Sequence, residues 1–117
     1  MGVTLKMLPV PRERGECCPL PVTIDGSWAA GQASFLKAIA DPTRLAMLAA
    51  LRKAEQPICI CDFTGALGLS QPTISHHVAK LRAAGLVDAE RAGIWTYYRL
   101  RRDLPARVTM VLDALLA

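Results

Sequence analysis

The sequence predicts a mainly helical fold with a β-hairpin wing, in the order α-α-α-α-β-β-α of a winged helix-turn-helix. Three observations support this prediction. Apolar residues recur at helical spacing in five segments. A glycine separates the third segment from the fourth, and two short stretches rich in aromatic and β-branched residues follow. The length of 117 residues fits one domain, which at this size often gains stability by dimerising.

Residues 1–26 are expected to form a flexible arm, because the prolines at positions 9, 11, 19 and 21 interrupt regular structure. Residues 27–117 are expected to form the folded domain, with Ser27 capping its first helix. The predicted helices span about 27–39, 41–54, 61–67, 71–84 and 103–116, and the predicted strands 86–91 and 94–100. Asp41 and Pro42 are an N-cap and a first helical residue, and Ala92-Gly93 is the expected hairpin turn.

The fourth predicted helix has the features of a DNA-reading helix. Gly68 supplies the turn before it, Ser70 caps it and Gly85 ends it. One face is apolar, formed by Ile74, Val78 and Leu81. The other face is predicted to present Gln71, Thr73, Ser75, His76, His77 and Lys80. These short or planar hydrogen-bonding groups suit base edges in the major groove.

The charge distribution favours a nucleic-acid partner. The net charge is +4, and the stretch 70–102 accounts for all of it with six basic and two acidic residues. Lys80, Arg82 and Arg91 are expected to bind phosphates. A merely solvated helix face is the competing interpretation, but such a face is usually rich in Glu and Lys, and residues 71–85 include no acidic residue.

Other classes of protein fit the sequence poorly. No apolar run approaches the roughly 18 residues that span a bilayer, and the N-terminus lacks a signal-peptide pattern, so we expect a cytoplasmic protein with no membrane contact. A thiol enzyme is not expected, because the chain has no Cys-x-x-Cys and no glycine-rich cofactor loop. The four cysteines fall in two pairs, Cys17-Cys18 and Cys59-x-Cys61, and clustered cytosolic cysteines indicate metal binding or redox chemistry.

Two segments resemble a known family. Asp41-Pro42-Thr43-Arg44 and the string Leu69-Ser70-Gln71-Pro72-Thr73-Ile74-Ser75-His76-His77 are similar to the ArsR/SmtB family of metal-responsive repressors. The resemblance implies a winged-helix homodimer, joined through its first and last helices, that binds a pseudo-palindromic double-stranded operator and leaves it when an inducer binds. The near-heptad spacing of Leu104, Val108, Val111 and Leu115 also suggests a helix-pair interface.

The cysteines resemble the inducer sites of this family. Cys59-Ile60-Cys61-Asp62 is similar to the sensor motif of arsenite and cadmium/lead members, although Thr64 stands where the best-known arsenite sensors carry a third cysteine. Cys17-Cys18 is similar to the N-terminal pair of a second class of arsenite sensors, in which the arm of one subunit reaches a helix cysteine of the other. The resemblance therefore implies that Cys17, Cys18 and one of Cys59 or Cys61, preferably Cys59, bind As(III) between subunits.

Several alternatives remain open at this stage. All four cysteines together suit Cd(II) or Pb(II), since thiolates select soft ions. If the cysteines instead form a disulfide on oxidation, the protein is a thiol-redox sensor. Cys59 and Cys61 are also compatible with a buried apolar role. His76 and His77 are possible metal ligands, although their place on the reading helix favours DNA contact.

Overall fold

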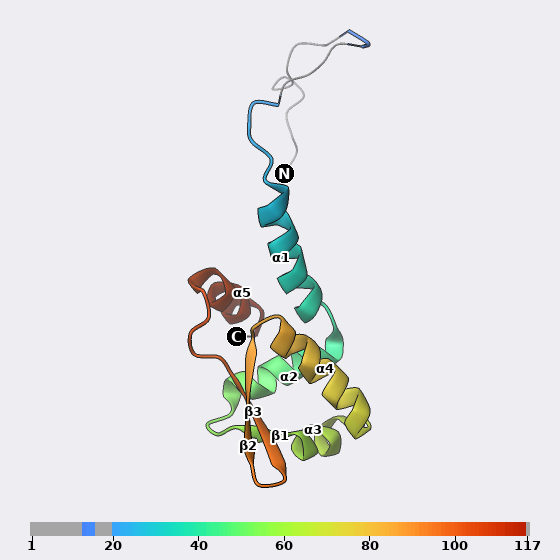
Figure 1. The fold of residues 1–117 in the computed structure, drawn as a ribbon, viewed down its shortest axis with the longest axis vertical. Helices are drawn as coiled ribbons and strands as arrows, with labels where there is room; N and C mark the ends of the chain where they lie inside the picture. Colours follow the sequence, from blue (N-terminus) through green and yellow to red (C-terminus); the bar gives the residue numbers. More distant parts are fainter. Residues whose placement is uncertain (1–12, 16–19, 117) are drawn as a thin grey trace.

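A computed structural model describes residues 13–15 and 20–116, and within them it confirms a winged helix-turn-helix (Figure 1). Its elements are α1 (Gly26–Ile39), α2 (Pro42–Lys53), β1 (Ile58–Cys59), α3 (Ile60–Leu67), α4 (Gln71–Ala83), β2 (Val87–Ala92), β3 (Trp95–Leu100) and α5 (Ala106–Leu116). The predicted order of helices and hairpin is confirmed, with one strand added. The last helix begins three residues later than position 103, after Pro105.

The helix starts follow from local capping. Asp41 caps α2 as predicted, since its Oδ2 accepts a hydrogen bond from the Arg44 N–H at 2.9 Å. The prediction of Ser27 as the first cap is wrong. Asp25 takes that role, and its Oδ1 accepts from the Trp28 N–H at 3.0 Å. A carboxylate two residues upstream makes the same bond and also interacts favourably with the helix dipole.

The turn between α3 and α4 and the end of α4 both depend on glycine. Gly68 has φ +66° and accepts the left-handed conformation that ends α3. Ser70 Oγ then accepts a hydrogen bond from the Thr73 N–H at 3.4 Å and so caps α4. At the other end Gly85 has φ +75°, and the Leu86 N–H donates to the Leu81 carbonyl at 3.0 Å, which is a Schellman motif.

The sheet has three antiparallel strands in the order β1-β3-β2. The hairpin pairs Ala92 with Trp95, so its two-residue turn is Gly93-Ile94 rather than the predicted Ala92-Gly93. Strand β1 was not predicted, because two residues are too short to show alternation. It forms because Cys59 pairs with Tyr97 at the edge of β3, which places the cysteine motif directly beside the wing.

The core lies between α2, α3, α4 and the sheet. Its fully buried side chains are Met47, Leu48, Ile74, Leu81 and Leu86. Helix α1 extends away from this core, and α5 lies near it, beside α2 (Figure 1). On α5 the buried residue is Leu112, which the predicted seam omitted, whereas Leu115 is exposed. No helix among the described residues is long and apolar enough to span a bilayer.

Candidate nucleic-acid interface and thiol site

Helix α4 presents a polar face to solvent and buries its apolar face. The exposed polar residues are Ser70, Gln71, Thr73, Ser75, His76, Lys80 and Arg82, and Arg91 is exposed on β2. Ile74, Val78 and Leu81 are buried on the opposite side, as their spacing predicted. This face therefore has the donors and the charge that a DNA-reading helix needs.

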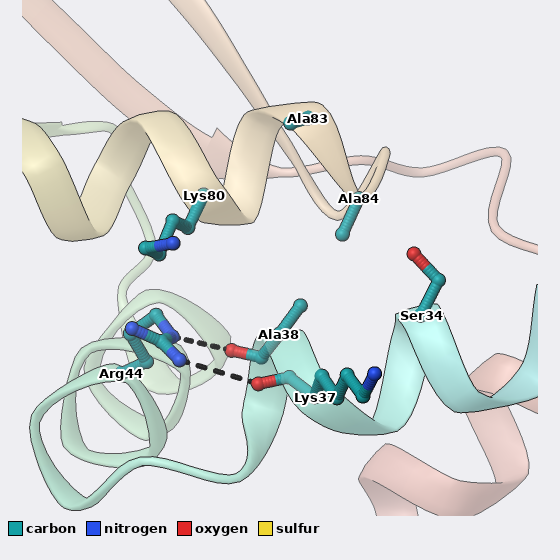
Figure 2. A pocket seen from close by; sticks show the side chains of 7 residues that line it. All are labelled: Ser34, Lys37, Ala38, Arg44, Lys80, Ala83 and Ala84. Carbon is teal, nitrogen blue, oxygen red and sulfur yellow. Dashed lines mark hydrogen bonds between the residues drawn. The ribbon is translucent and has the colours of Figure 1, made fainter.

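Arg44 joins α2 to the end of α1. Figure 2 shows its guanidinium bonding to two carbonyl oxygens at the C-terminus of α1. Nε donates to the Ala38 oxygen at 2.5 Å, and Nη2 donates to the Lys37 oxygen at 3.2 Å. These carbonyls are at the negative end of the helix dipole, so the cation neutralises that end. Sequence reasoning used Arg44 only as part of a motif and missed this structural role.

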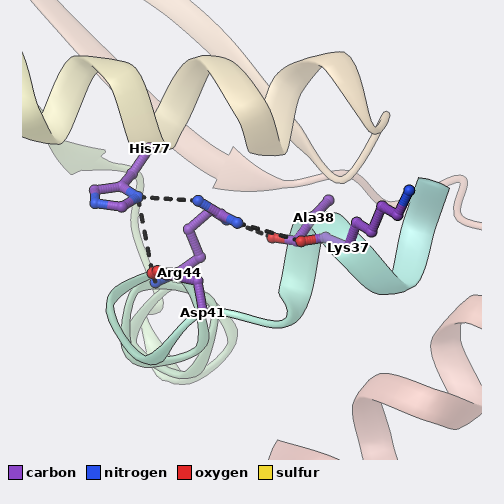
Figure 3. Close-up of polar contacts among 5 residues, drawn as sticks. All are labelled: Lys37, Ala38, Asp41, Arg44 and His77. Carbon is purple, nitrogen blue, oxygen red and sulfur yellow. Dashed lines mark hydrogen bonds and ion pairs between the residues drawn. The ribbon is translucent and has the colours of Figure 1, made fainter. Parts of the chain in front are cut away.

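His77 does not lie on the outer face of α4 with the other polar residues, so that expectation is wrong. Only 15% of its side chain is exposed, and the ring points toward α2 (Figure 3). Arg44 Nη1 lies 3.2 Å from His77 Nδ1. A guanidinium only donates, so Nδ1 accepts and carries no proton in this arrangement. His77 lies three residues after Ile74 and four before Leu81, a spacing that turns it toward the core.

Asp41 completes this cluster. Its Oδ2 lies 3.8 Å from His77 Nδ1, which is too long for a hydrogen bond. The hydrogen bond from the Arg44 N–H, with the Arg44 guanidinium nearby, lowers the pKa of the Asp41 carboxyl. Asp41, Arg44 and His77 together connect the C-terminus of α1 and the N-terminus of α2 to the middle of the reading helix.

The two described cysteines form a close pair at the start of α3. Cys59 is buried and is the N-cap residue, whereas Cys61 is exposed in the first turn. The Cys61 thiol donates to Cys59 Sγ at 2.8 Å. That bond, followed by desolvation, raises the pKa of the Cys61 thiol. The Asp62 carboxylate accepts from the Cys59 N–H at 3.0 Å and holds this turn in place.

A cleft of about 380 Å³ lies between Cys61 and the reading helix. Cys61 and Thr64 line it from α3, Gln71 and Ser75 from α4, and Trp95 from the wing. A movement of Cys61 would therefore alter the surroundings of Gln71 and Ser75, two candidate DNA-reading side chains, and of the hairpin.

The predicted arm cysteines, Cys17 and Cys18, lie outside the described residues. Within the described residues no group of three or more metal-binding side chains is assembled. Cys59 and Cys61 supply two adjacent soft donors there, so a three-thiolate site built from one chain's cysteines needs at least one of Cys17 and Cys18, and a four-thiolate site needs both.

The fold and the α4 face define a winged helix-turn-helix DNA-binding protein. Residues 41–89 match the bacterial regulatory proteins of the arsR family. The chain is 45% identical over 76 residues to the arsenic resistance transcriptional regulator ArsR1 of Pseudomonas putida, covering 65% of this chain and 59% of that protein. It is 40% identical over 79 residues to the arsenical resistance operon repressor of Escherichia coli, covering 68% and 67%.

Comparison with solved structures supports the same fold. NolR from Sinorhizobium fredii superposes with a TM-score of 0.67 and 32% identity, covering 80% of this chain and 92% of that chain. The chain belongs to the arsR family, and it is a transcriptional repressor rather than an enzyme.

Proposed function

We propose that this repressor responds to arsenite, binding operator DNA as a homodimer and leaving it when Cys17, Cys18 and Cys59 bind As(III). The main support is the Cys59–Cys61 pair at the N-terminus of α3, in a chain similar to proteins named for arsenic resistance. Binding replaces the three hydroxyls of arsenous acid by three sulfurs and releases three waters. The thiols supply the protons, and no electrons are transferred.

Release of DNA needs the inducer to bind one conformation of the protein better than the other. Cys59 is both the last residue of β1 and the cap of α3, so an As–S bond there acts on the wing and on α3 together. Arsenic on Cys59 also competes with the hydrogen bond from Cys61. Because Cys61 lines the cleft beside Gln71 and Ser75, this change would disturb the reading helix.

The proposed DNA contacts are those of the exposed α4 face and the wing. We assign base contacts to Gln71, Thr73, Ser75 and His76, with Ser70 at the helix start, and phosphate contacts to Lys80, Arg82 and Arg91. His77 is assigned a positioning role through Arg44 instead. His76→Ala should weaken binding to the operator more than binding to random DNA, and an equal loss for both would remove His76 from sequence reading.

The proposed homodimer uses α1 and α5. Both helices expose large apolar side chains, with Trp28 58% and Leu36 52% exposed on α1 and Met110 70% on α5. Exposed apolar groups of this size favour a protein partner. A dimer formed through this surface would place the N-terminal segment of one subunit near the other subunit, as an arsenic site between subunits requires.

The test is arsenite titration of operator-bound protein under reducing conditions, followed by fluorescence anisotropy. Cys17→Ser and Cys18→Ser should bind DNA normally and fail to be released. Cys59→Ser should also fail, whereas the matched variant Cys61→Ser should still respond. Arsenic X-ray absorption should count three sulfurs. Release of DNA by wild type without any As–S bonds, or normal release of Cys17→Ser, would contradict the proposed site.

Two alternative inducers are tested by the same assay. Release by Cd(II) or Pb(II), with loss of the response in all four Cys→Ser variants, would indicate a four-thiolate site. The 2.8 Å approach of the Cys59 and Cys61 sulfurs also favours a redox response. In that reaction an oxidant such as a peroxide accepts two electrons and two protons as the sulfurs join. Release by peroxide but not by arsenite would establish the redox function instead.

A further inference from the structure

A cationic cavity lies between the C-terminal half of α1 and α4 (Figure 2). Its volume is about 230 Å³, and its lining includes Lys37, Arg44, Lys80 and the Ser34 hydroxyl. No carboxylate lines it. In the part of the chain that the structure describes, neither lysine forms an ion pair with an acidic side chain. The cavity therefore concentrates positive charge beside α4.

Arg44 makes this cavity suitable for an anion. The C-terminus of a helix repels anions through its free carbonyls, but the Arg44 guanidinium already binds the carbonyls of Lys37 and Ala38. Asp41 lies nearby, yet the cavity lining includes only the cations and small residues. With three of its five N–H donors engaged, Arg44 contributes mainly charge, and the ammonium groups of Lys37 and Lys80 remain as donors.

The cavity also lies in a useful place relative to the reading helix. Lys80 follows Thr73 by seven residues, two helical turns along the same side of α4. Arg44 bonds both to the carbonyls at the end of α1 and to His77, and so it fixes the end of α1 against α4. An anion held by Lys37 and Lys80 would consequently sit at a fixed position beside the face that carries the base-reading side chains.

We propose that this cavity binds a backbone phosphate of the operator, with Lys37 and Lys80 as cationic donors and Ser34 as a hydroxyl donor. The inference rests on the proposed DNA binding and extends the interface to α1, outside the helix-turn-helix and the wing. A phosphate gripped there sets the register of α4 on the duplex without reading sequence. A DNA phosphate is favoured over a free oxyanion because the cavity borders the reading helix and is open at the surface.

The decisive measurement is the salt dependence of DNA binding for Lys37→Gln. One lost phosphate contact should reduce the slope of log K against log[salt] by about 0.9, which corresponds to roughly fivefold weaker binding at 0.15 M salt. The loss should be equal for operator and random duplexes, and Ser34→Ala should weaken both to a smaller, also equal extent. Lys53→Gln, an exposed lysine at the end of α2, is the matched control and should leave the slope unchanged.

An unchanged slope in Lys37→Gln, or an equal reduction in Lys53→Gln, would overturn the proposal. Inorganic phosphate, added at constant ionic strength, separates the two sources of phosphate. Binding of inorganic phosphate that Lys37→Gln abolishes, with no change in the DNA slope, would make the cavity a free-anion site and also overturn the proposal. Wild-type release by arsenite is measured in the same series, so failure of the inducer proposal is seen separately from the slope.

Discussion

Replacing Arg44 by Ala should destabilise the protein more than its partly exposed position suggests. The guanidinium makes three hydrogen bonds, to the carbonyls of Lys37 and Ala38 and to His77 Nδ1. Two of them are partly buried, and at about 1–1.5 kcal/mol each they contribute roughly 2–3 kcal/mol. The exposed bond to Lys37 adds little, because water replaces it. The Ala variant also leaves the end of α1 without its cationic cap.

Urea unfolding, followed by circular dichroism at one fixed protein concentration, measures this loss as a shift in the midpoint. Arg52→Ala is the matched control, since Arg52 lies on the same helix and pairs with Asp113. That pair is exposed, at 34% and 54%, so its loss should cost only about 0–1 kcal/mol. Equal losses for the two variants would refute the claim that Arg44 acts by tying α1 to α4.

Three further predictions concern the thiol pair, the α2 cap and the core. Cys59→Ala removes the sulfur that raises the pKa of Cys61, so iodoacetamide should alkylate Cys61 faster at pH 8. The rate is measured by mass spectrometry in a Cys17→Ser/Cys18→Ser background, and an unchanged rate would contradict the hydrogen bond between the two thiols. The lowered pKa of Asp41 predicts that wild type is more stable than Asp41→Asn above the ordinary pKa of 3.8, and that this advantage disappears as pH falls through the lowered value; a pH-independent difference in urea unfolding would be inconsistent. Leu81→Ala, at a position with no exposure, should cost about 2–5 kcal/mol of unfolding free energy, and a cost below 1 kcal/mol would mean that α4 is not packed as described.

Local patterns in the chain were enough for the order of elements and for most of their ends. Asp41, Ser70 and Gly85 act within one helical turn of themselves, through caps and left-handed turns whose chemistry depends on the residue type. The buried face of α4 follows from a spacing of three and four residues. These features are visible without any long-range contact.

The cap of α1 shows the limit of this reasoning. Asp25 and Ser27 are both good cap residues, and the sequence does not say which one the chain uses. Strand β1 was missed for a related reason: its two residues become a strand only when β3 supplies the hydrogen-bonding partners.

The candidate site divides in the same way. The residue types of the α4 face and the Cys59-x-Cys61 spacing identified a DNA-reading helix and a soft-ligand pair from the chain alone, because hydrogen-bonding and thiol chemistry belong to the side chains themselves. The inward turn of His77, the cap that Arg44 places on α1 and the cavity between Lys37 and Lys80 needed the packed helices. Those contacts join residues between six and 43 positions apart, and only the packing of one helix against another brings such residues together.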